Sequence, residues 1–477
     1  MILSSFTTRT PALQLAASLL LGTLVAAGVT SAPTVNPRGE WSTPAESFRT
    51  RVVATGFSSP WEVAWGPDGF LWITERVGKR VVRVNPADGS RSVAVTIDEV
   101  YQRVGQDGLL GMAFDPGPRG GRSDVYVMYT YDADAGPGER RRAKVRRYTF
   151  NPATQRLEHP RDVVANLPHG DDHGGGRLAI GRDGALYLSR GDHGANFLAN
   201  RCLANRAQQL PTAADVRTRT WEAYQGKILR VNPDGSIPAD NPVIAGVRSH
   251  VFSYGHRNPQ GLAVVADGRI LATEHGQDTD DEINLIEAGR NYGWPLIAGF
   301  QDNQYYAYTN WSASSPAPCA SLAYGRDVPA SVPTITESAV QLPNLVAPLR
   351  TFFTVPSAYD RRRLGNATAA VTGADIYDET AIPGWRSSLL VTSLMSGVVF
   401  RMPLSSDPEM VGPPQTYFRS TNRYRDLAVA PDGRRIYVIT DNEGRTLADD
   451  RTVTASLQNP GALLEFTYAG PRALPAR

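Results

Sequence analysis

The sequence predicts an all-β protein, and specifically a β-propeller, from three observations. A turn-and-strand unit recurs along the chain, segments with helical periodicity are few, and the 477 residues leave room for many strands. Each unit joins an Asp-Gly pair to an alternating run of aromatic and aliphatic residues, at 65–75, 180–189, 265–273 and 430–440. Asp-Gly favours a tight turn because Gly adopts positive φ readily and Asp bonds its own backbone. With a strand on either side, each unit is expected to form a hairpin.

Further strand-like runs fill the gaps between these hairpins, for example at 124–130, 227–231 and 389–402. The 44 Gly and 35 Pro residues interrupt the rest of the chain, so helices should be scarce. Many short strands with an irregular repeat favour radial repetition. Two β-sandwich domains are the alternative, and the repeats alone do not determine the number of blades.

The hairpins are unevenly spaced, which predicts long insertions between strands. The two clearest insertions are 201–224 and 301–346. Insertions of this kind usually gather on one face of a propeller and build the functional site.

The N-terminal segment differs from the rest of the chain and predicts export. Arg9 supplies a positive charge, 13–27 is an apolar run, and 29–32 is a stretch of small residues, which is typical of a cleaved signal peptide. An uncleaved anchor is the alternative, but the run is short for a bilayer. We therefore expect a periplasmic or secreted protein. The expected organisation is a signal peptide at 1–32, a linker-like segment at 33–47, a catalytic propeller at 48–470 and a tail at 471–477.

The charge balance restricts the partners. Lys and Arg total 49, Asp and Glu total 47, and the formal charge is +2. This gives no field to attract nucleic acid or an anionic membrane, and no later segment is apolar enough to span a bilayer. A small or neutral partner is expected. The two cysteines, Cys202 and Cys319, could pair in an oxidising compartment, but the sequence leaves their separation open.

A histidine in a glycine-rich loop is the first candidate for chemistry. His173 follows two aspartates and precedes three glycines, so it is expected to be accessible and able to remove a proton from a hydroxyl. Asp192, at the end of a predicted strand, could orient such an imidazole. A solvated turn is the alternative for both.

Two further segments are rich in groups that bind anions or quinone oxygens. In 255–261, Arg257 and Asn258 lie between glycines that allow a close backbone approach. Arg423 and Arg425 are two residues apart, so on a strand they share a face and could bind an acidic cofactor. Surface ion pairs are the alternative for the two arginines.

The segment 274–282 holds five acidic side chains in nine residues. Clustered oxygen donors suit Ca²⁺ better than zinc, although the spacing is not that of an EF-hand. An acidic solvated turn is the competing interpretation.

Taken together, these segments resemble the soluble quinoprotein, that is pyrroloquinoline quinone (PQQ)-dependent, glucose or aldose sugar dehydrogenases. The similarity runs from about 52 to 468, and its most specific motifs are 105–111, 255–261, 280–286, 291–295 and 422–426, in the order of the family. The resemblance implies a six-bladed propeller that uses PQQ and Ca²⁺. It also implies a sugar substrate, a separate electron acceptor of unknown identity and a possible homodimer.

The resemblance also implies roles for individual residues. His173 matches the catalytic base, Asp192 its supporting carboxylate, and Arg257 a catalytic and cofactor-binding position over the quinone. Gln106 and Asp172 match sugar contacts. The remaining cofactor contacts match Asn258, Thr368, Arg423 and Arg425. The calcium ligands match Gly276 and Gln277 at the active site and Glu282, Tyr292, Ala298, Phe300, Asp302 and Glu337 at a second site, where Ala298 and Phe300 could act only through main-chain carbonyls.

The chain departs from the family pattern at three places. Met395 stands where a quinone-contacting Lys is expected, Phe197 stands where a sugar-contacting Gln is expected, and 359–368 is shorter than the usual sugar loop. The expected reaction is PQQ-dependent oxidation of an aldose, or a related hydroxyl compound, to the lactone. The alternatives are a calcium-dependent lactone hydrolase on the same propeller and a non-catalytic extracellular binding module.

Overall fold

The computed structural model describes residues 44–472 except 104, 116–123, 135, 137, 326, 361–366, 408–410 and 449–451. The predicted signal peptide, most of the linker-like segment and nearly all of the tail lie outside the described residues. No helix in the described part of the chain has both the length and the apolar character needed to cross a membrane.

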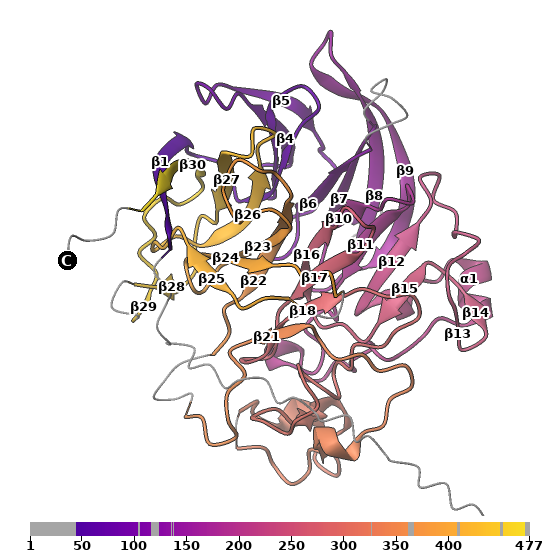
Figure 1. Cartoon of the computed structure of the whole chain (residues 1–477). Coiled ribbons are helices and arrows are strands. Elements are labelled where there is room, and N and C mark those ends of the chain that lie inside the picture. Colours follow the sequence, from indigo (N-terminus) through magenta and orange to yellow (C-terminus); the bar gives the residue numbers. More distant parts are fainter. Residues whose placement is uncertain are drawn as a thin grey trace, which may run out of the picture. The chain divides into compact units, whose positions relative to one another are not determined.

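Six four-stranded antiparallel sheets form the blades of a propeller, which confirms the predicted fold (Figure 1). Blade one is β2 (Pro60–Trp65), β3 (Leu71–Glu75), β4 (Arg80–Val84) and β5 (Arg91–Thr96). Blade two is β6 (Leu109–Phe114), β7 (Asp124–Asp132), β8 (Arg141–Asn151) and β9 (Arg156–Pro168). Blade three is β10 (Leu178–Ile180), β11 (Leu186–Arg190), β12 (Lys227–Val231) and β15 (Val251–Tyr254).

The chain continues in the same order through the other three blades. Blade four is β16 (Pro259–Val264), β17 (Ile270–Glu274), β18 (Asp281–Leu285) and β21 (Arg350–Phe352). Blade five is β22 (Val371–Tyr377), β23 (Ser388–Ser393), β24 (Val399–Pro403) and β25 (Gln415–Tyr417). Blade six is β26 (Tyr424–Val429), β27 (Arg435–Thr440), β30 (Leu463–Pro471) and β1 (Glu46–Ala54).

The two ends of the described chain close the ring. β1 pairs antiparallel with β30, with Thr50 opposite Phe466, so the first strand of the chain is the outermost strand of the last blade. The innermost strands β26 and β2 are in contact, which brings blade six against blade one. Closure joins residues more than 400 positions apart in sequence.

The alternating direction of the side chains along each strand explains how adjacent blades pack. In β7, Tyr126 and Met128 are buried against blade three, whereas Val125 and Val127 are buried against blade one. Side chains of a strand point alternately to the two faces of its sheet, and here both faces are covered. Six such hydrophobic clusters lie between adjacent blades, one at each interface. Truncating a core residue such as Leu188 to Ala would cost about 2–5 kcal/mol.

Two features of the predicted strands can be compared with the strands of the structure. The four Asp-Gly turns join the two innermost strands of blades one, three, four and six. The run 389–402, expected to be strand-like throughout, is instead split between β23 and β24, because a tight turn at 394–398 reverses the chain.

The predicted insertions occupy blades three and four. The first, between β11 and β12, contains the 3-10 helices η1 (Leu198–Asn200) and η2 (Glu222–Tyr224) and the helix α1 (Ala213–Thr218). The second, between β18 and β21, contains η3 (Trp311–Ala313), η4 (Cys319–Ser321), η5 (Glu337–Ala339) and the strands β19 (Tyr308–Thr309) and β20 (Thr334–Ile335). Two further hairpins are β13 (Val243–Ile244) with β14 (Val247–Arg248) and β28 (Thr446–Leu447) with β29 (Val453–Thr454).

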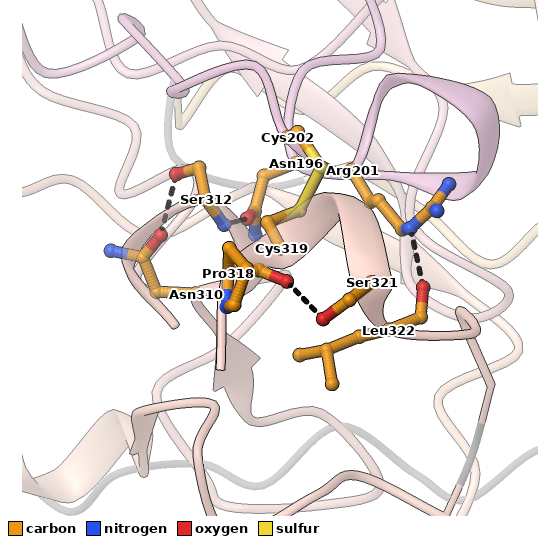
Figure 2. The surroundings of a disulfide bond; sticks show 9 residues. All are labelled: Asn196, Arg201, Cys202, Asn310, Ser312, Pro318, Cys319, Ser321 and Leu322. Carbon is orange, nitrogen blue, oxygen red and sulfur yellow. Dashed lines mark hydrogen bonds between the residues drawn. A yellow bond between two sulfur atoms is a disulfide. The ribbon is translucent and has the colours of Figure 1, made fainter. Parts of the chain in front are cut away.

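A disulfide joins the two insertions. Cys202 and Cys319 are bonded, with their Cα atoms 5.6 Å apart, which answers the question that the sequence left open (Figure 2). The cross-link spans 117 residues and ties blade three to blade four outside the sheets.

Candidate active site

The predicted site residues gather at one end of the blades. In each Asp-Gly hairpin the second strand ends beside the start of the innermost strand, as Glu274 of β17 does beside Pro259 of β16. Polar residues lie at or just after these ends: Arg76 after β3, Asp192 after β11, His275 after β17 and Asp441 after β27. Segments far apart in sequence therefore meet on one face of the propeller.

His173 and Asp192 form a buried pair. The Nδ1 atom of His173 lies 2.7 Å from Oδ1 of Asp192, so this nitrogen carries the proton and Nε2 is the acceptor in the neutral ring. His173 has a φ of 45°, an uncommon backbone conformation for a non-glycine residue that is often found at functional positions. Gly191 leaves room for this conformation, because a Cβ there would lie 1.9 Å from the carbonyl oxygen of His173.

Asp192 is held by three more donors. Its Oδ2 accepts hydrogen bonds from Trp294 Nε1 at 2.6 Å and Asn205 Nδ2 at 2.7 Å, and its Oδ1 accepts one from the Gly194 amide. Burial alone would raise the pKa of Asp192, but the charge and hydrogen bond of His173 and the nearby Arg257 outweigh it and lower the pKa. The carboxylate is therefore ionised and fixed in place, as an orienting group for His173 requires.

The two predicted sugar contacts meet beside this pair. Gln106 donates from Nε2 to Asp172 Oδ1 at 2.9 Å, and Asp172 Oδ2 lies 3.7 Å from His173 Nε2. The Asp172 carboxylate thus lies near the nitrogen that would accept a proton, and the Gln106 amide holds this carboxylate.

Arg257 and Asn258 are anchored through their backbone and present unpaired side-chain donors. Both amides bond to Glu274 Oε1. The Arg257 guanidinium lies between the rings of Phe197 and Trp294, at 5.5 and 5.2 Å. Arg257 Nε and Asn258 Nδ2 are buried and bond to no other described residue. Unpaired buried donors are costly, so a ligand that accepts from them is favoured here.

Arg425 lies on β26 and Arg423 directly precedes this strand, and both bind Asp441. Arg425 contacts this carboxylate through Nε at 2.8 Å and Nη2 at 2.9 Å, and Arg423 through Nε at 3.2 Å. Burial would raise the pKa of Asp441, but Arg425, Arg423 and Arg76 together lower it. Glu443 also acts on Arg76 and Arg423. Asp107 acts on Arg76 as well, so three guanidiniums meet at Asp441 with two further carboxylates nearby.

Met395 lies within this arginine cluster. Its Sδ is 3.7 Å from Arg423 Nη1, and its amide bonds to Ala369 O. The thioether therefore stands where the family pattern has a cation, next to a group that would bind an acidic ligand.

Gly276, Gln277 and Thr368 surround Asp281 on the blade-four side of the site. Asp281 accepts from the Gly276 amide at 2.8 Å and from the Thr368 hydroxyl at 2.7 Å. Burial raises the pKa of Asp281 to about 6. Gly276 is required for this turn, since a Cβ would lie 1.9 Å from Thr279 O. The Gln277 side chain points to Tyr324 Oη at 3.5 Å, so only its carbonyl suits the predicted metal.

The second predicted calcium set includes a group of buried carboxylates. Glu337 accepts from the amides of Ala298 at 3.0 Å and Asn303 at 2.9 Å, and Glu282 accepts from Gly299. Burial, reinforced by Asp302 and Asp280, raises the pKa of Glu337 to about 7.

The neighbours of this group have raised pKa values too. Burial and the carboxylates around it raise the pKa of Asp280 to about 7 and that of Glu282 well above its usual range, and burial raises that of Asp302. Within the described residues no three His, Cys, Asp or Glu side chains are grouped closely enough to hold a metal ion. A site built partly from carbonyls, as predicted for Ala298, needs fewer such side chains.

Tyr292 and Phe300, two residues of the second predicted calcium set, make hydrogen bonds to other parts of the protein. The Tyr292 hydroxyl bonds to Leu285 O and to the Glu287 amide, so only its main chain is left for a metal. The Phe300 carbonyl accepts from the Asp302 amide at 2.8 Å.

A cavity of about 660 Å³ adjoins the His173 side of the site. Phe197 stacks over His173, with ring centroids 6.2 Å apart and an interplanar angle of 24°. The cavity is lined by Phe197, Leu198, Gln277, Asp278, Tyr305, Tyr306, Ala307, Thr309, Tyr324, Gly325 and Val328. Its aromatic wall follows from Phe197 in place of the expected Gln.

Sequence reasoning missed Arg76, Asp441, Asn205 and the role of Trp294. Arg76 and Asp441 follow the second strands of two Asp-Gly hairpins, the same place that Asp192 holds in blade three. A polar residue just after the second strand of an Asp-Gly hairpin could therefore have been used to predict a site residue. Asn205 and Trp294 come from the insertions and carry no such signal.

Comparison with known proteins determines the family. The family profile described as glucose/sorbosone dehydrogenase matches residues 57–324 and 357–448. The chain belongs to this family. It is 41% identical over 443 residues to quinoprotein glucose dehydrogenase B of Acinetobacter calcoaceticus, covering 89% of this chain and 91% of that protein.

Two further similar proteins extend the comparison. Aldose sugar dehydrogenase YliI of Escherichia coli K12 is 25% identical over 412 residues, covering 85% of this chain and 93% of that protein. The PQQ-bound aldose sugar dehydrogenase of Streptomyces coelicolor superposes with a TM-score of 0.59 at 25% identity, covering 90% of this chain and all of the other. The resemblance drawn from the sequence motifs is confirmed.

Proposed function

We propose that this protein is a PQQ-dependent dehydrogenase that oxidises an aldose, or a related hydroxyl compound, to the lactone. The His173–Asp192 pair carries the proposal, because Nε2 of His173 lies near Asp172, to which Gln106 is bonded, on the same face as the arginine cluster. Membership of a family that includes a quinoprotein glucose dehydrogenase and a PQQ-bound sugar dehydrogenase supports it.

The residues fit an anionic quinone. PQQ carries three carboxyl groups, and Arg76, Arg423 and Arg425 meet at one place as candidate partners for them. The unpaired donors of Arg257 and Asn258 suit quinone oxygens.

In the proposed oxidation, the residues of the site have separate roles. His173 accepts the hydroxyl proton of the sugar at Nε2, and Asp192 keeps the ring in the required tautomer and stabilises its charged form. Gln106 and Asp172 orient the sugar. PQQ, when bound, supplies the hydride acceptor. Arg257 and Asn258 would hold its oxygens by hydrogen bonds, and excluded water strengthens those bonds.

Reconstitution tests this proposal. The mature protein is incubated with Ca²⁺ and PQQ, and a panel of aldoses is screened with an artificial dye acceptor. Dye reduction with at least one aldose is expected. Lactone hydrolysis without the quinone would favour the hydrolase alternative. No dye reduction with any aldose, together with an unchanged quinone spectrum, would contradict the proposal.

Calcium is proposed at two places, at the carbonyls of Gly276 and Gln277 and at the carboxylates around Glu337. The raised pKa of Glu337 reflects burial next to other carboxylates, a cost that a divalent cation would remove. Adding Ca²⁺ to chelator-treated protein should therefore raise the melting temperature. The Glu337→Gln variant should lose much of this increase, and the half-buried control variant Glu158→Gln on β9 should keep it. An equal increase in all three proteins would place calcium elsewhere.

The cellular context is also proposed. Residues 1–32 would direct export to the periplasm or medium, and N-terminal sequencing of the exported protein would locate the cleavage. An electron acceptor of unknown identity would reoxidise the cofactor. A homodimer is proposed from the family resemblance, and light scattering of the purified protein tests it.

A further inference from the structure

The aromatic wall of the cavity is formed by residues from two insertions. Phe197 stacks over His173, and Tyr324 meets Phe197 edge-on with centroids 5.6 Å apart. Leu198 follows on the cavity rim and is 53% exposed. Phe197 comes from the blade-three insertion and Tyr324 from the blade-four insertion, so the wall depends on how the two insertions are joined.

Contacts between the insertions lie on both sides of Phe197 in the sequence, and Figure 2 shows those of Asn196, Arg201 and Cys202. Before it, Asn196 donates from Nδ2 to Thr309 O at 2.6 Å and accepts from the Ser312 amide at 3.0 Å. After it, Arg201 Nε donates to Leu322 O at 3.0 Å, and Cys202 is bonded to Cys319. We call these contacts the insertion clamp.

Apart from the clamp, the segment is held by hydrogen bonds within its own turn and by one from Asn200 Nδ2 to His193 O. The η1 turn that begins at Leu198 buries none of its residues. Asn196 and Leu198 have φ values of 64° and 46°, a region that is costly for leucine. Such a conformation persists only where surrounding contacts determine it. The clamp supplies those contacts, and the disulfide removes alternative conformations of the linked segments.

We infer that the insertion clamp positions Phe197 against His173 and thereby determines which substrates reach the proposed base. This inference rests on the proposed function. Asn196, Cys202 and Cys319 are positioning residues, since they act through Phe197. The wall that they hold is apolar, so the part of the substrate beyond the reacting carbon meets an aromatic face.

Opening the clamp should affect binding more than chemistry. His173, Asp192 and the arginine cluster lie outside the insertion clamp, so the maximal rate should change little. If Phe197 is displaced, it no longer excludes sugars that fit the cavity poorly. It also no longer contacts the sugars that fit well. We expect KM for the best aldose to rise by about tenfold and the preference among aldoses to narrow, the scale of one lost apolar contact.

The experiment compares two clamp variants with a matched control. One variant is Cys202→Ser with Cys319→Ser. The other is Asn196→Gly, which keeps the positive φ and removes only the side-chain contacts. The control is Ser321→Ala, which loses a hydrogen bond to Pro318 O within the η4 segment and no contact between the insertions. KM and kcat are measured over the aldose panel, and hydrogen–deuterium exchange is followed at 196–202 and 309–322.

The two clamp variants should show a raised KM, a nearly unchanged kcat and faster exchange in both segments, with the blade strands and the control unaffected. Wild-type KM values and exchange in both clamp variants would overturn the inference. If the wild-type protein reduces no dye with any aldose, the proposed function and the substrate role of the clamp both fail. In that case, hydrogen–deuterium exchange alone decides whether the insertion clamp orders the segment 196–202.

Discussion

At the residue scale, the direction of the proton path depends on a single hydrogen bond. Asp192 is ionised and bonded to Nδ1 of His173, which leaves Nε2 facing Asp172. A base that is oriented in this way contributes about 10²–10⁴-fold to a rate. The pair is buried, so its orientation does not depend on solvent.

Replacing His173 by Ala should therefore lower kcat by about a thousandfold while leaving PQQ affinity nearly unchanged, because His173 is outside the arginine cluster. Steady-state dye reduction and calorimetry with PQQ measure the two effects. His159→Ala, at an exposed position on β9, is the control. Turnover of His173→Ala at the wild-type rate would remove His173 as the base.

Met395 provides a second test at this scale. A Lys at this position would lie beside Arg423, so Met395→Lys should lower the melting temperature of the unliganded protein by like-charge repulsion. It should also tighten PQQ binding by about tenfold, since the ligand is anionic. Met395→Leu should change neither quantity. If the Lys variant binds PQQ no more tightly than Met395→Leu does, Met395 is not at the quinone.

The residues that hydrogen-bond to the site residues were the hardest feature to predict from the sequence. His173, Asp192, Arg423 and Arg425 follow from motifs. One short hairpin, β10–β11, brings His173 and Asp192 to the same end of blade three, and Arg423 and Arg425 are two residues apart. Asn205 bonds to Asp192 from within an insertion, and its position depends on a long connection with no regular period. Such contacts are tertiary, so no local pattern encodes them.

At the scale of elements, the Asp-Gly hairpins were predictable because turn chemistry and alternation act within a few residues. Two blades lack this turn, and one of them joins β22 to β23 through a longer connection. The blade number therefore came from the family resemblance and not from the repeats. The pairing of β1 with β30 is a contact between the ends of the chain, which hairpin signals cannot reveal.

The innermost strands also hold a buried charge cluster. Arg177 Nη1, just before β10, contacts Glu62 of β2 at 2.5 Å and Asp426 of β26 at 2.9 Å. Two carboxylates share one guanidinium in a buried place, so one of them is favoured in the protonated form. Burial, opposed by Arg177 and reinforced by Asp426, raises the pKa of Glu62 from 4.5 to about 8.

This cluster predicts how stability depends on pH. Between pH 4.5 and 8 the folded protein binds more protons at Glu62 than the unfolded chain does, so this contribution is complete below pH 4.5 and is lost as pH rises through 8. Glu62→Gln should remove it, so the melting temperature relative to wild type should be higher at pH 8.5 than at pH 5, by about 2 °C. The exposed control Glu287→Gln should show no such difference. An identical pH profile for Glu62→Gln and wild type would contradict the prediction.

At the scale of the whole molecule, the site depends on ring closure. Arg76 belongs to blade one, His173 precedes blade three, Arg257 precedes blade four and Arg425 belongs to blade six. A nearly neutral chain thus concentrates positive charge at one place. The central claim is that this place binds PQQ.

Calorimetric titration of PQQ into the Ca²⁺-loaded protein tests that claim most directly. Wild type should bind one equivalent, with an affinity that falls as salt is added, and Arg425→Ala should bind at least about tenfold more weakly. Arg435→Ala, at the other end of the same hairpin, should match wild type. No saturable binding to wild type, or equal affinity in Arg425→Ala, would contradict the account.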